Sequence, residues 1–566
     1  MTFSRTLSDR ALATRSLRLA LAAMVLALAA LPAAAQTQAW IKQFGDPNPN
    51  YGEFAAACVQ DASGGVYLAG GTEGSLGGPQ AGASDPWLAR YDGAGNQLWI
   101  RQFGTGFVQV AFAATSDGAG GLYVSGPTGG NLAGPSSGAD DAWLARYDSA
   151  GNQLWIRQFG SSADDTPYFA SADGSGGVYV GGWTYGSLGG TNPGGFDFWL
   201  ARYDGVGNQL WVRQLGTIMH ETGTAAAPDG SNGVYVCGWT TGNLTAPNLP
   251  VDPSVFGQED AWLARYDSAG NQVWIRQFGG NVGGGASGAA PDGSGGVYVA
   301  GGTLDAWVAR YDSAGNRLWI RQFGTASWDQ VRAAAGGASG VYLAGATGGS
   351  FGGPNAGKDD AWLARYDGAG NQLWILQLGT SEDDHARAVA IHGSGGVYVC
   401  GYTTGNLGGA QAGGPDPWVA RYDEPCAGWN YCTAKTNSAG CAPSIAASGV
   451  VSASAGSGFT ISTQNVLDNK FGVYFYSKSG PSGLPFQGGI LCAQVPLVRT
   501  LLSNSGGTPP CGGSFQMDFN AYIASGKDPA LVAGQQVWLQ TWSRDPGFAP
   551  PNNTSLSDAL SFTICP

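Results

Sequence analysis

The sequence has little of what many enzyme active sites need. Its 566 residues include only three histidines and four methionines, and Asp, Glu, Lys and Arg together make up 12%. We find no H-E-x-x-H segment and no phosphate-binding loop, so zinc-dependent hydrolysis and nucleotide chemistry have no sequence signature here. These absences favour a protein without catalytic activity.

Long apolar runs are also scarce, and the one that exists stands near the start. Four arginines precede LALAAMVLALAAL (Leu19–Leu31), and Pro32–Ala35 supplies the small residues of a cleavage site. This pattern predicts a signal peptide over residues 1–35, although a retained anchor is the alternative. No later run is long and apolar enough for a stable membrane span. We therefore expect a secreted, cell-surface or periplasmic protein.

Basic residues are few. The whole chain carries a net charge of −13, and loss of residues 1–35 would remove four Arg and one Asp and make it more acidic. Such a surface repels nucleic acid. Thirteen of the remaining Lys and Arg belong to the repeats described below, which leaves ten. That number predicts no anion-binding patch.

What the sequence has in abundance is repetition. The segment WIKQFG and its relatives begin at Trp40, Trp99, Trp155, Trp211, Trp274, Trp319 and Trp374. A second motif, D-x-W-[LV]-A-R-Y-D, contains Trp87, Trp143, Trp199, Trp262, Trp307, Trp362 and Trp418. A third motif, V-Y-[VL] or L-Y-V, precedes each of the latter. Repeats of this length indicate one repeat architecture rather than independent domains.

Each repeat reads as four antiparallel strands. A small-residue segment, the V-Y-V segment, WLARYD and QLWIRQFG are short and bounded by turns such as DGSGG and DSAGN. Four-stranded units arranged radially make a β-propeller. The first three strands occur seven times, whereas the last WLARYD-type strand, at Trp418, has no successor. We predict that the strand around Trp40 fills that place and closes a seven-bladed ring over residues 36–424.

These motifs resemble a known family. D-x-W-L-A-R-Y-D-x-x-G-N-x-L-W, followed by F-G and G-G-V-Y-V-x-G-x-T, is similar to the SBBP-type bacterial β-propeller repeat over residues 38–424. The resemblance implies the fold and export, and it transfers no catalytic residue. We expect an extracellular binding or scaffold protein whose ligand, a protein or a glycan, lies on the face with long, variable loops.

Carboxylates at the start of the innermost strand are the first candidate site. Counting back from the turn that follows this strand, equivalent positions hold Glu53, Gln109, Asp165, Glu221, Gly284, Trp328 and Asp384. Glu53, Asp165, Glu221 and Asp384 would converge on the channel mouth, where oxygen ligands favour Ca²⁺. The other interpretation is that each carboxylate caps its own turn, in which case no cofactor is required. The same carboxylates would serve the alternative function, a carbohydrate-active hydrolase or lyase.

Aromatic side chains are the second candidate site. Trp183, Trp239 and Tyr402 directly precede the last Thr of their V-Y-V strands, and Trp328 lies near the channel mouth. They are candidate stacking platforms for a sugar, or alternatively covers for the bases of loops.

The C-terminal part, residues 425–566, has a different composition. Cysteines stand at positions Cys426, Cys432, Cys441, Cys492, Cys511 and Cys565. In an exported protein they predict three disulfides, with fifteen possible connectivities. Segments such as GVYFYSK and QQVWLQTWS indicate strands. We therefore predict a small disulfide-containing β-sandwich-like domain, which resembles an uncharacterised Cys-rich module of exported bacterial proteins. Cys58, Cys237 and Cys400 are expected to be buried in the propeller.

Overall fold

The computed structural model describes residues 37–48, 50–244, 259–279, 284–302, 304–337, 339–392, 396–423, 429–449, 451–508 and 510–565. The predicted signal peptide (1–35) and Cys426 lie outside this described part of the chain. Among the described residues, no helix is long and apolar enough to cross a membrane.

Seven of the sheets in the described residues have four antiparallel strands each, and we call each of these sheets a blade. Blade 1 contains β2 (Glu53–Gln60), β3 (Val66–Thr72), β4 (Asp85–Tyr91) and β5 (Gln97–Gln102), and blade 2 contains β6 (Ala113–Ser116), β7 (Leu122–Thr128), β8 (Asp141–Tyr147) and β9 (Gln153–Phe159). Blade 3 contains β10 (Asp165–Ala172), β11 (Val178–Thr184), β12 (Asp197–Tyr203) and β13 (Gln209–Leu215), blade 4 contains β14 (Glu221–Pro228), β15 (Val234–Thr240), β16 (Asp260–Tyr266) and β17 (Gln272–Phe278), and blade 5 contains β18 (Ala286–Pro291), β19 (Val297–Gly301), β20 (Ala306–Tyr311) and β21 (Arg317–Phe323). Blade 6 contains β22 (Asp329–Gly337), β23 (Gly340–Thr347), β24 (Asp360–Tyr366) and β25 (Gln372–Leu378), and blade 7 contains β26 (Asp384–His392), β27 (Gly396–Thr403), β28 (Asp416–Asp423) and β1 (Thr37–Gln43).

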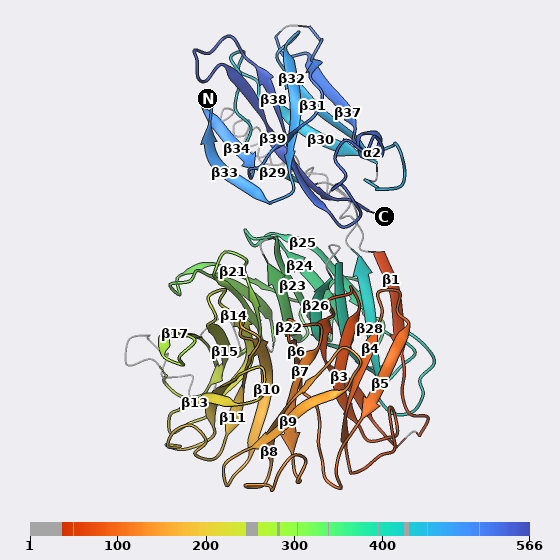
Figure 1. Cartoon of the computed structure of the whole chain (residues 1–566), viewed down its shortest axis with the longest axis vertical. Coiled ribbons are helices and arrows are strands. Elements are labelled where there is room, and N and C mark those ends of the chain that lie inside the picture. Colours follow the sequence, from red (N-terminus) through yellow and green to blue (C-terminus); the bar gives the residue numbers. More distant parts are fainter. Residues whose placement is uncertain are drawn as a thin grey trace, which may run out of the picture. The chain divides into compact units, whose positions relative to one another are not determined.

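The first strand of each blade lies on the inside of the arrangement. These inner strands are β2, β6, β10, β14, β18, β22 and β26. Each is hydrogen-bonded to one strand only, the second strand of its blade, and lies against the inner strands of the neighbouring blades. In Figure 1 the blades follow one another in chain order, and the red β1 lies beside the cyan β28. We call the space that the inner strands surround the central channel.

The N-terminal strand completes the last blade. β1 pairs antiparallel with β28, and Trp40 lies opposite Arg421 while Gln43 lies opposite Trp418. The prediction that the strand around Trp40 lies beside the one around Trp418 is therefore confirmed. Side chains strengthen the junction, because Gln43 Nε2 donates to Asp416 Oδ2 at 2.8 Å and Gln43 Oε1 accepts from Leu407 N at 2.9 Å.

The hydrophobic core is divided into layers between neighbouring blades. One such layer joins Leu144 of blade 2 to Val180 and Trp199 of blade 3. The tryptophans of the third strands are fully buried, and the second strands are buried almost throughout. Strands covered on both faces favour continuous apolar sequences such as VYV, which is why this motif recurs in every blade.

The repeated polar residues join each blade to the next. Tyr179 Oη of blade 3 donates to the Asn232 carbonyl of blade 4 at 2.5 Å, and Trp155 Nε1 of blade 2 donates to the Gly205 carbonyl of blade 3 at 3.1 Å. Gly207 follows in the same turn with φ of +85°, and a Cβ there would lie 2.8 Å from the Trp155 ring. The repeated G-N turn therefore needs glycine both for its backbone conformation and for this contact.

The sequence also suggests that the repeated arginines pair with the carboxylates of D-x-W or R-Y-D. In blade 7 this pairing is present, because Arg421 Nε lies 2.7 Å from Asp423 Oδ1, whereas in blades 1 to 5 the arginine binds a different carboxylate. Arg202 binds Asp173 of the turn after the inner strand, with Nη2 and Oδ2 2.7 Å apart, and its guanidinium lies over the Tyr179 ring. In blade 2 the R-Y-D carboxylate caps its own hairpin, where Asp148 Oδ1 accepts from Ala150 N and Asn152 N. The repeated residues thus act as the frame of the fold.

The C-terminal part contains further sheets and one short helix. Its elements are β29 (Trp429–Tyr431), β30 (Ser444–Ser448), β31 (Thr460–Val466), β32 (Phe471–Ser477), β33 (Pro481–Phe486), β34 (Gly489–Ala493), β35 (Val498–Arg499), β36 (Ser503–Asn504), β37 (Gly513–Asp518), α2 (Phe519–Ala524), β38 (Gln536–Arg544) and β39 (Thr554–Thr563). The larger sheet has the order β29-β39-β38-β32-β35, with β36 also paired to β32, and β30-β31-β37 form another. One core contains Ile461 of the second sheet and Leu539 of the first, so the two sheets pack face to face.

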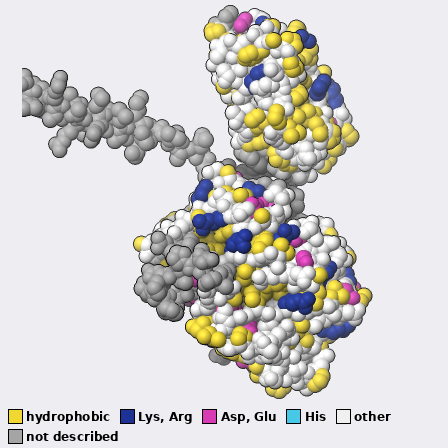
Figure 2. Space-filling model, turned by 90° about the vertical axis from the view of Figure 1, so that its left-hand side faces the viewer, with side chains coloured by type: hydrophobic (Ala, Val, Ile, Leu, Met, Phe, Trp, Pro, Cys, Tyr) yellow, Lys and Arg dark blue, Asp and Glu magenta, His cyan; other side chains and the backbone are white. Residues whose placement is uncertain are grey.

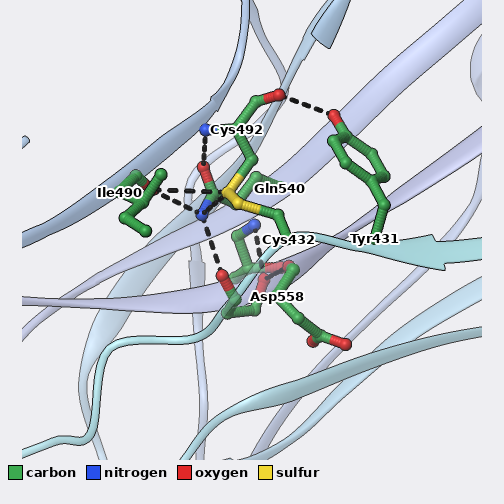
Figure 3. Close-up of a disulfide and its surroundings, with 8 residues drawn as sticks. Tyr431, Cys432, Ile490, Cys492, Gln540 and Asp558 are labelled. Carbon is green, nitrogen blue, oxygen red and sulfur yellow. Dashed lines mark hydrogen bonds between the residues drawn. A yellow bond between two sulfur atoms is a disulfide. The ribbon is translucent and has the colours of Figure 1, made fainter. Parts of the chain in front are cut away.

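Two disulfides link distant segments of this C-terminal part. They join Cys432 to Cys492 and Cys441 to Cys511, and Cys565 is also disulfide-bonded. Figure 3 shows the first, where Gln540 accepts from Cys492 N and donates to the Ile490 carbonyl while Tyr431 Oη donates to the Cys492 carbonyl. The disulfide between Cys432 and Cys492 and the side-chain amide of Gln540 together hold β34 against the larger sheet.

The three cysteines of the blades are free and buried, as the sequence predicts. Cys58 of β2 and Cys400 of β27 belong to one hydrophobic cluster between blades 1 and 7. They are not joined by a disulfide in this structure.

Candidate functional site

Two of the predicted aromatic residues belong to one group of rings on blades 3 and 4. Trp183 and Trp239 are the next-to-last residues of β11 and β15, and Phe196, from the loop before β12, lies between them. The Phe196 ring centroid is 5.4 Å from that of Trp183 and 5.5 Å from that of Trp239. Trp183 and Trp239 are thus brought together through a residue that the sequence analysis did not single out.

Two more rings extend this group. Tyr185 lies edge-on to Trp183 at 5.3 Å and is 48% exposed, and the His220 ring lies 4.3 Å from that of Phe196. Ile218 and Met219, on the loop before β14, are 76% and 40% exposed. We call Trp183, Tyr185, Phe196, His220 and Trp239 the aromatic cluster. It offers an apolar surface next to solvent, a feature typical of interaction sites.

The other predicted aromatic residues lie together on blades 6 and 7. His385 of β26 stacks on Tyr402 at a centroid distance of 4.8 Å, and the Trp328 ring lies 6.2 Å from His385. Burial, followed by the nearby guanidinium groups of Arg332 and Arg387, lowers the pKa of His385 to about 4. The imidazole is therefore neutral near pH 7, so the ring presents a flat, uncharged face.

The four carboxylates proposed as metal ligands are buried in their own turns. Asp165 Oδ2 accepts from Ser161 N, and Asp384 Oδ2 accepts from Thr380 N, both at 2.5 Å. Glu221 accepts from Thr217 and Thr240, and Glu53 accepts from Thr72 Oγ1 at 3.1 Å. All four are at most 1% exposed, and in this structure each accepts hydrogen bonds from the turn beside it.

The same turn corrects one register in the sequence analysis. In blade 6 the capping position is held by Asp329, whose Oδ2 accepts from Thr325 N, and not by Trp328. The prediction of Trp328 assumes the same number of residues between this position and the second strand in every blade. In blade 6 the turn between β22 and β23 is shorter, so the prediction is wrong by one residue. Among the described residues, the structure brings together no group of three or more His, Cys, Asp or Glu side chains suited to a metal ion.

Glu53 carries a marked pKa shift. Burial raises its pKa to about 7, hydrogen bonds from Thr72 and the Asp46 amide oppose the rise, and the carboxylates of Asp46 and Asp416 add to it. The ordinary value is 4.5, so the folded protein holds the proton more tightly than the unfolded chain. The stability that this group contributes is present below pH 4.5 and is lost as the pH rises to about 7.

We therefore expect Glu53→Gln to stabilise the protein at and above neutral pH. The gain should be on the order of 2 kcal/mol at pH 8 and should vanish below pH 4.5, because the wild-type carboxyl is then protonated as well. Thermal unfolding from pH 4 to 8 measures it, with the exposed Glu73→Gln as the matched control. A gain that is the same at every pH would contradict this explanation.

Basic side chains do not form a continuous area on the face drawn in Figure 2. Lys and Arg lie there in small separate groups with hydrophobic and neutral atoms between them. In the C-terminal part, Lys435 lies beside a cavity of about 460 Å³, but its ammonium group donates to the carbonyls of Gln487, Asn552 and Thr554 and lies over the Phe548 ring. These contacts give Lys435 a structural role.

Comparison with known proteins gives one family match and several partial similarities. Residues 373–408, which span β25 to the loop after β27, match the family model SBBP, described as a beta-propeller repeat. The regulatory protein FlaEY of Caulobacter vibrioides is 29% identical over 236 residues, covering 37% of this chain and 24% of that protein. The chain thus spans about a quarter of the length of this relative.

Two solved structures have low similarity. The WD40 domain of Pan2 from Neurospora crassa is 10% identical with a TM-score of 0.40, over 70% of this chain and 97% of that one. A protein of unknown function from Dyadobacter fermentans is 12% identical with a TM-score of 0.38, over 70% of this chain and all of that one.

Proposed function

We propose that this chain, a β-propeller repeat protein, is a non-catalytic binding protein that acts outside the cytoplasm. In this proposal residues 1–35 are a signal peptide, residues 36–424 form a closed ring of seven blades, and residues 425–566 form a separate disulfide-containing module. The ligand binds where the loops after the second strands meet the loops before the inner strands.

The aromatic cluster is the observation that supports this assignment. Its two indoles, Trp183 and Trp239, stand at a position where blades 1 and 6 carry the small residues Gly71 and Ala346. The frame does not need aromatic side chains there, because those blades form the same strand pairs without them. Rings that the fold does not need, held next to solvent, favour a role in binding.

A glycan is the ligand class that this cluster suits best. Flat rings with exposed faces can stack on the apolar faces of sugar rings, and Phe196 and Tyr185 hold the two indoles in position by edge-on contacts. The chain beginning at Gln36 should therefore bind a subset of a glycan array. Trp183→Ala combined with Trp239→Ala should weaken that binding at least tenfold, equivalent to about 1.4 kcal/mol.

The control for this experiment is Phe471→Ala. Phe471 is 54% exposed and belongs to β32 in the C-terminal part, so its loss should leave binding unchanged. Melting temperatures of all variants should agree within a few degrees. Undiminished glycan binding by the folded double variant would exclude the aromatic cluster as the site.

A further inference from the structure

A bulge in each inner strand sets one side chain apart from the strand pairing. The register of the inner strand shifts at a single residue in six blades, and in blade 2 both Phe112 and Ala113 lie opposite Ser125. The bulged residues are Ala56, Phe112, Tyr168, Thr224, Ser287, Arg332 and Arg387. Bulges redirect side chains and often accompany functional sites. The side chains at these seven positions differ in chemistry, although the strand pairing around them is the same.

The bulged side chains reach toward the inner strand of the next blade. Phe112 stacks on Tyr168 at 5.9 Å, Thr224 Oγ1 donates to the Ala286 carbonyl at 2.6 Å, and Ser287 Oγ donates to the Val331 carbonyl at 2.6 Å. The guanidinium of Arg387 lies 5.3 Å from the Phe54 ring of blade 1. The bulged residues therefore surround the central channel in sequence.

Arg332 and Arg387 occupy adjacent places in this ring. Each lies three residues after the carboxylate that begins its strand, Asp329 or Asp384, and β22 contacts β26 directly. Neither arginine forms an ion pair with a carboxylate among the described residues, whereas five arginines of the frame each bind a buried Asp. The Arg332 side chain keeps solvent access at its place in β22, and desolvation by the surrounding protein, followed by the charge of Arg387, lowers its pKa. Two like charges thus lie near each other, and within the described ranges no carboxylate forms an ion pair with either.

Aromatic side chains flank the pair. Arg387 lies 5.0 Å from the Tyr402 ring, which stacks on His385, and Trp328 lies beyond His385. Toward the other end of the same strands, Ala334, Ala335 and Ala390 help to line an open pocket of about 560 Å³, whose other lining residues come from three further blades. The inner strands therefore carry a charged group of residues toward one end and line an open pocket toward the other.

We propose that Arg332 and Arg387 form an anion-binding site in the central channel, which holds the carboxylate or sulfate group of an organic ligand against the rings of Tyr402 and Phe54. Guanidinium groups bind such oxyanions through paired hydrogen bonds and stack on aromatic rings. The aromatic cluster on blades 3 and 4 is a separate set of residues, so this site does not depend on the proposed function.

Calorimetry on the chain beginning at Gln36 tests the proposal with three probes: sodium sulfate, oligogalacturonate and the corresponding neutral oligogalactose. We expect sulfate and the uronate to bind, and the neutral sugar to bind at least tenfold more weakly than the uronate. Arg332→Gln and Arg387→Gln should each weaken anion binding at least tenfold. Arg317→Gln, on the outer strand β21, is the matched control and should change nothing.

The relative affinity of the two anions identifies the source of the ligand group. Tighter binding of the uronate indicates a sugar acid, and equal or tighter binding of sulfate indicates a small free anion. The absence of binding by both anions at millimolar concentration would overturn the proposal, as would equal anion affinity in the Arg332→Gln, Arg387→Gln double variant.

A stability measurement provides an independent readout. In low salt, Arg332→Gln should raise the melting temperature because it removes the repulsion between the two guanidinium groups. Sulfate should then stabilise the wild type more than this variant. Identical sulfate-induced shifts in both proteins would contradict an anion site, since general salt effects act on both alike.

Discussion

Starting the chain at Phe44, without strand β1, is expected to lower the free energy of unfolding of the blades by about 3–5 kcal/mol, the cost typical of deleting one large buried aromatic side chain. The deletion removes the partner of β28 and the hydrogen bonds of Gln43 to the loop before it. It also removes Trp40, whose Nε1 donates to the Gly93 carbonyl of blade 1 at 3.0 Å. Chemical denaturation followed by tryptophan fluorescence measures the loss.

A relocated strand is the control. In blade 1, Gly-Ala-Gly-Asn joins Asp92 to Gln97 opposite Tyr91, and in blade 7 Gln38 lies opposite Tyr422. Inserting Gly-Ala-Gly-Asn and then Gln38–Gln43 after Asp423, in the chain that starts at Phe44, should restore most of the stability. Unchanged stability after the deletion, or no recovery after the insertion, would contradict closure by β1.

Replacing Cys441 and Cys511 together by serine is expected to destabilise the C-terminal part by about 4 kcal/mol, because the disulfide closes a long loop. The two cysteines are 70 residues apart, and those of the second disulfide are 60 residues apart. The loss should affect β30, β31 and β37 and leave the blades intact. Limited proteolysis before and after heating distinguishes the two parts of the chain.

Reduction of the wild-type protein is the matching control for the disulfide variant. It should reproduce the increased protease sensitivity of the C-terminal part without altering the blades, whose three cysteines are free. Proteolysis that is insensitive to both treatments would show that the sheets of this part are stable without their disulfides.

The strands of the blades could be predicted from the sequence because their constraints are local and repeated. Trp143, Tyr147 and Arg146 occur at fixed spacing because β8 is buried between blades while Arg146, at its partly exposed end, reaches Asp117. The pairing of β1 with β28 followed from counting strands. The arginine pairing required the structure, because Asp117 and Asp148 stand in similar turns and only the fold brings Asp117 to the guanidinium group.

The candidate sites could be predicted only in part. Trp183 and Trp239 stand out because they interrupt a repeated pattern, whereas Phe196 and Tyr185 lie in variable loops where no pattern exists to interrupt. The small number of basic residues gave no reason to single out Arg332 and Arg387, because a count of residues does not show which of them lie close together in the fold. Alignment of the inner strands at their 56-residue spacing would have placed Phe112, Tyr168 and Thr224 in one ring. The bulge that redirects them has no sequence signature of its own.

The central claim is that the repeated residues form the frame and that the ligand binds at positions where the repeat varies. Determining the structure of the chain from Gln36 with the strongest glycan from the array tests it most directly. We expect density for the sugar against Trp183 and Trp239. A ligand bound to the outer strands of the blades, or to the C-terminal part alone, would contradict it.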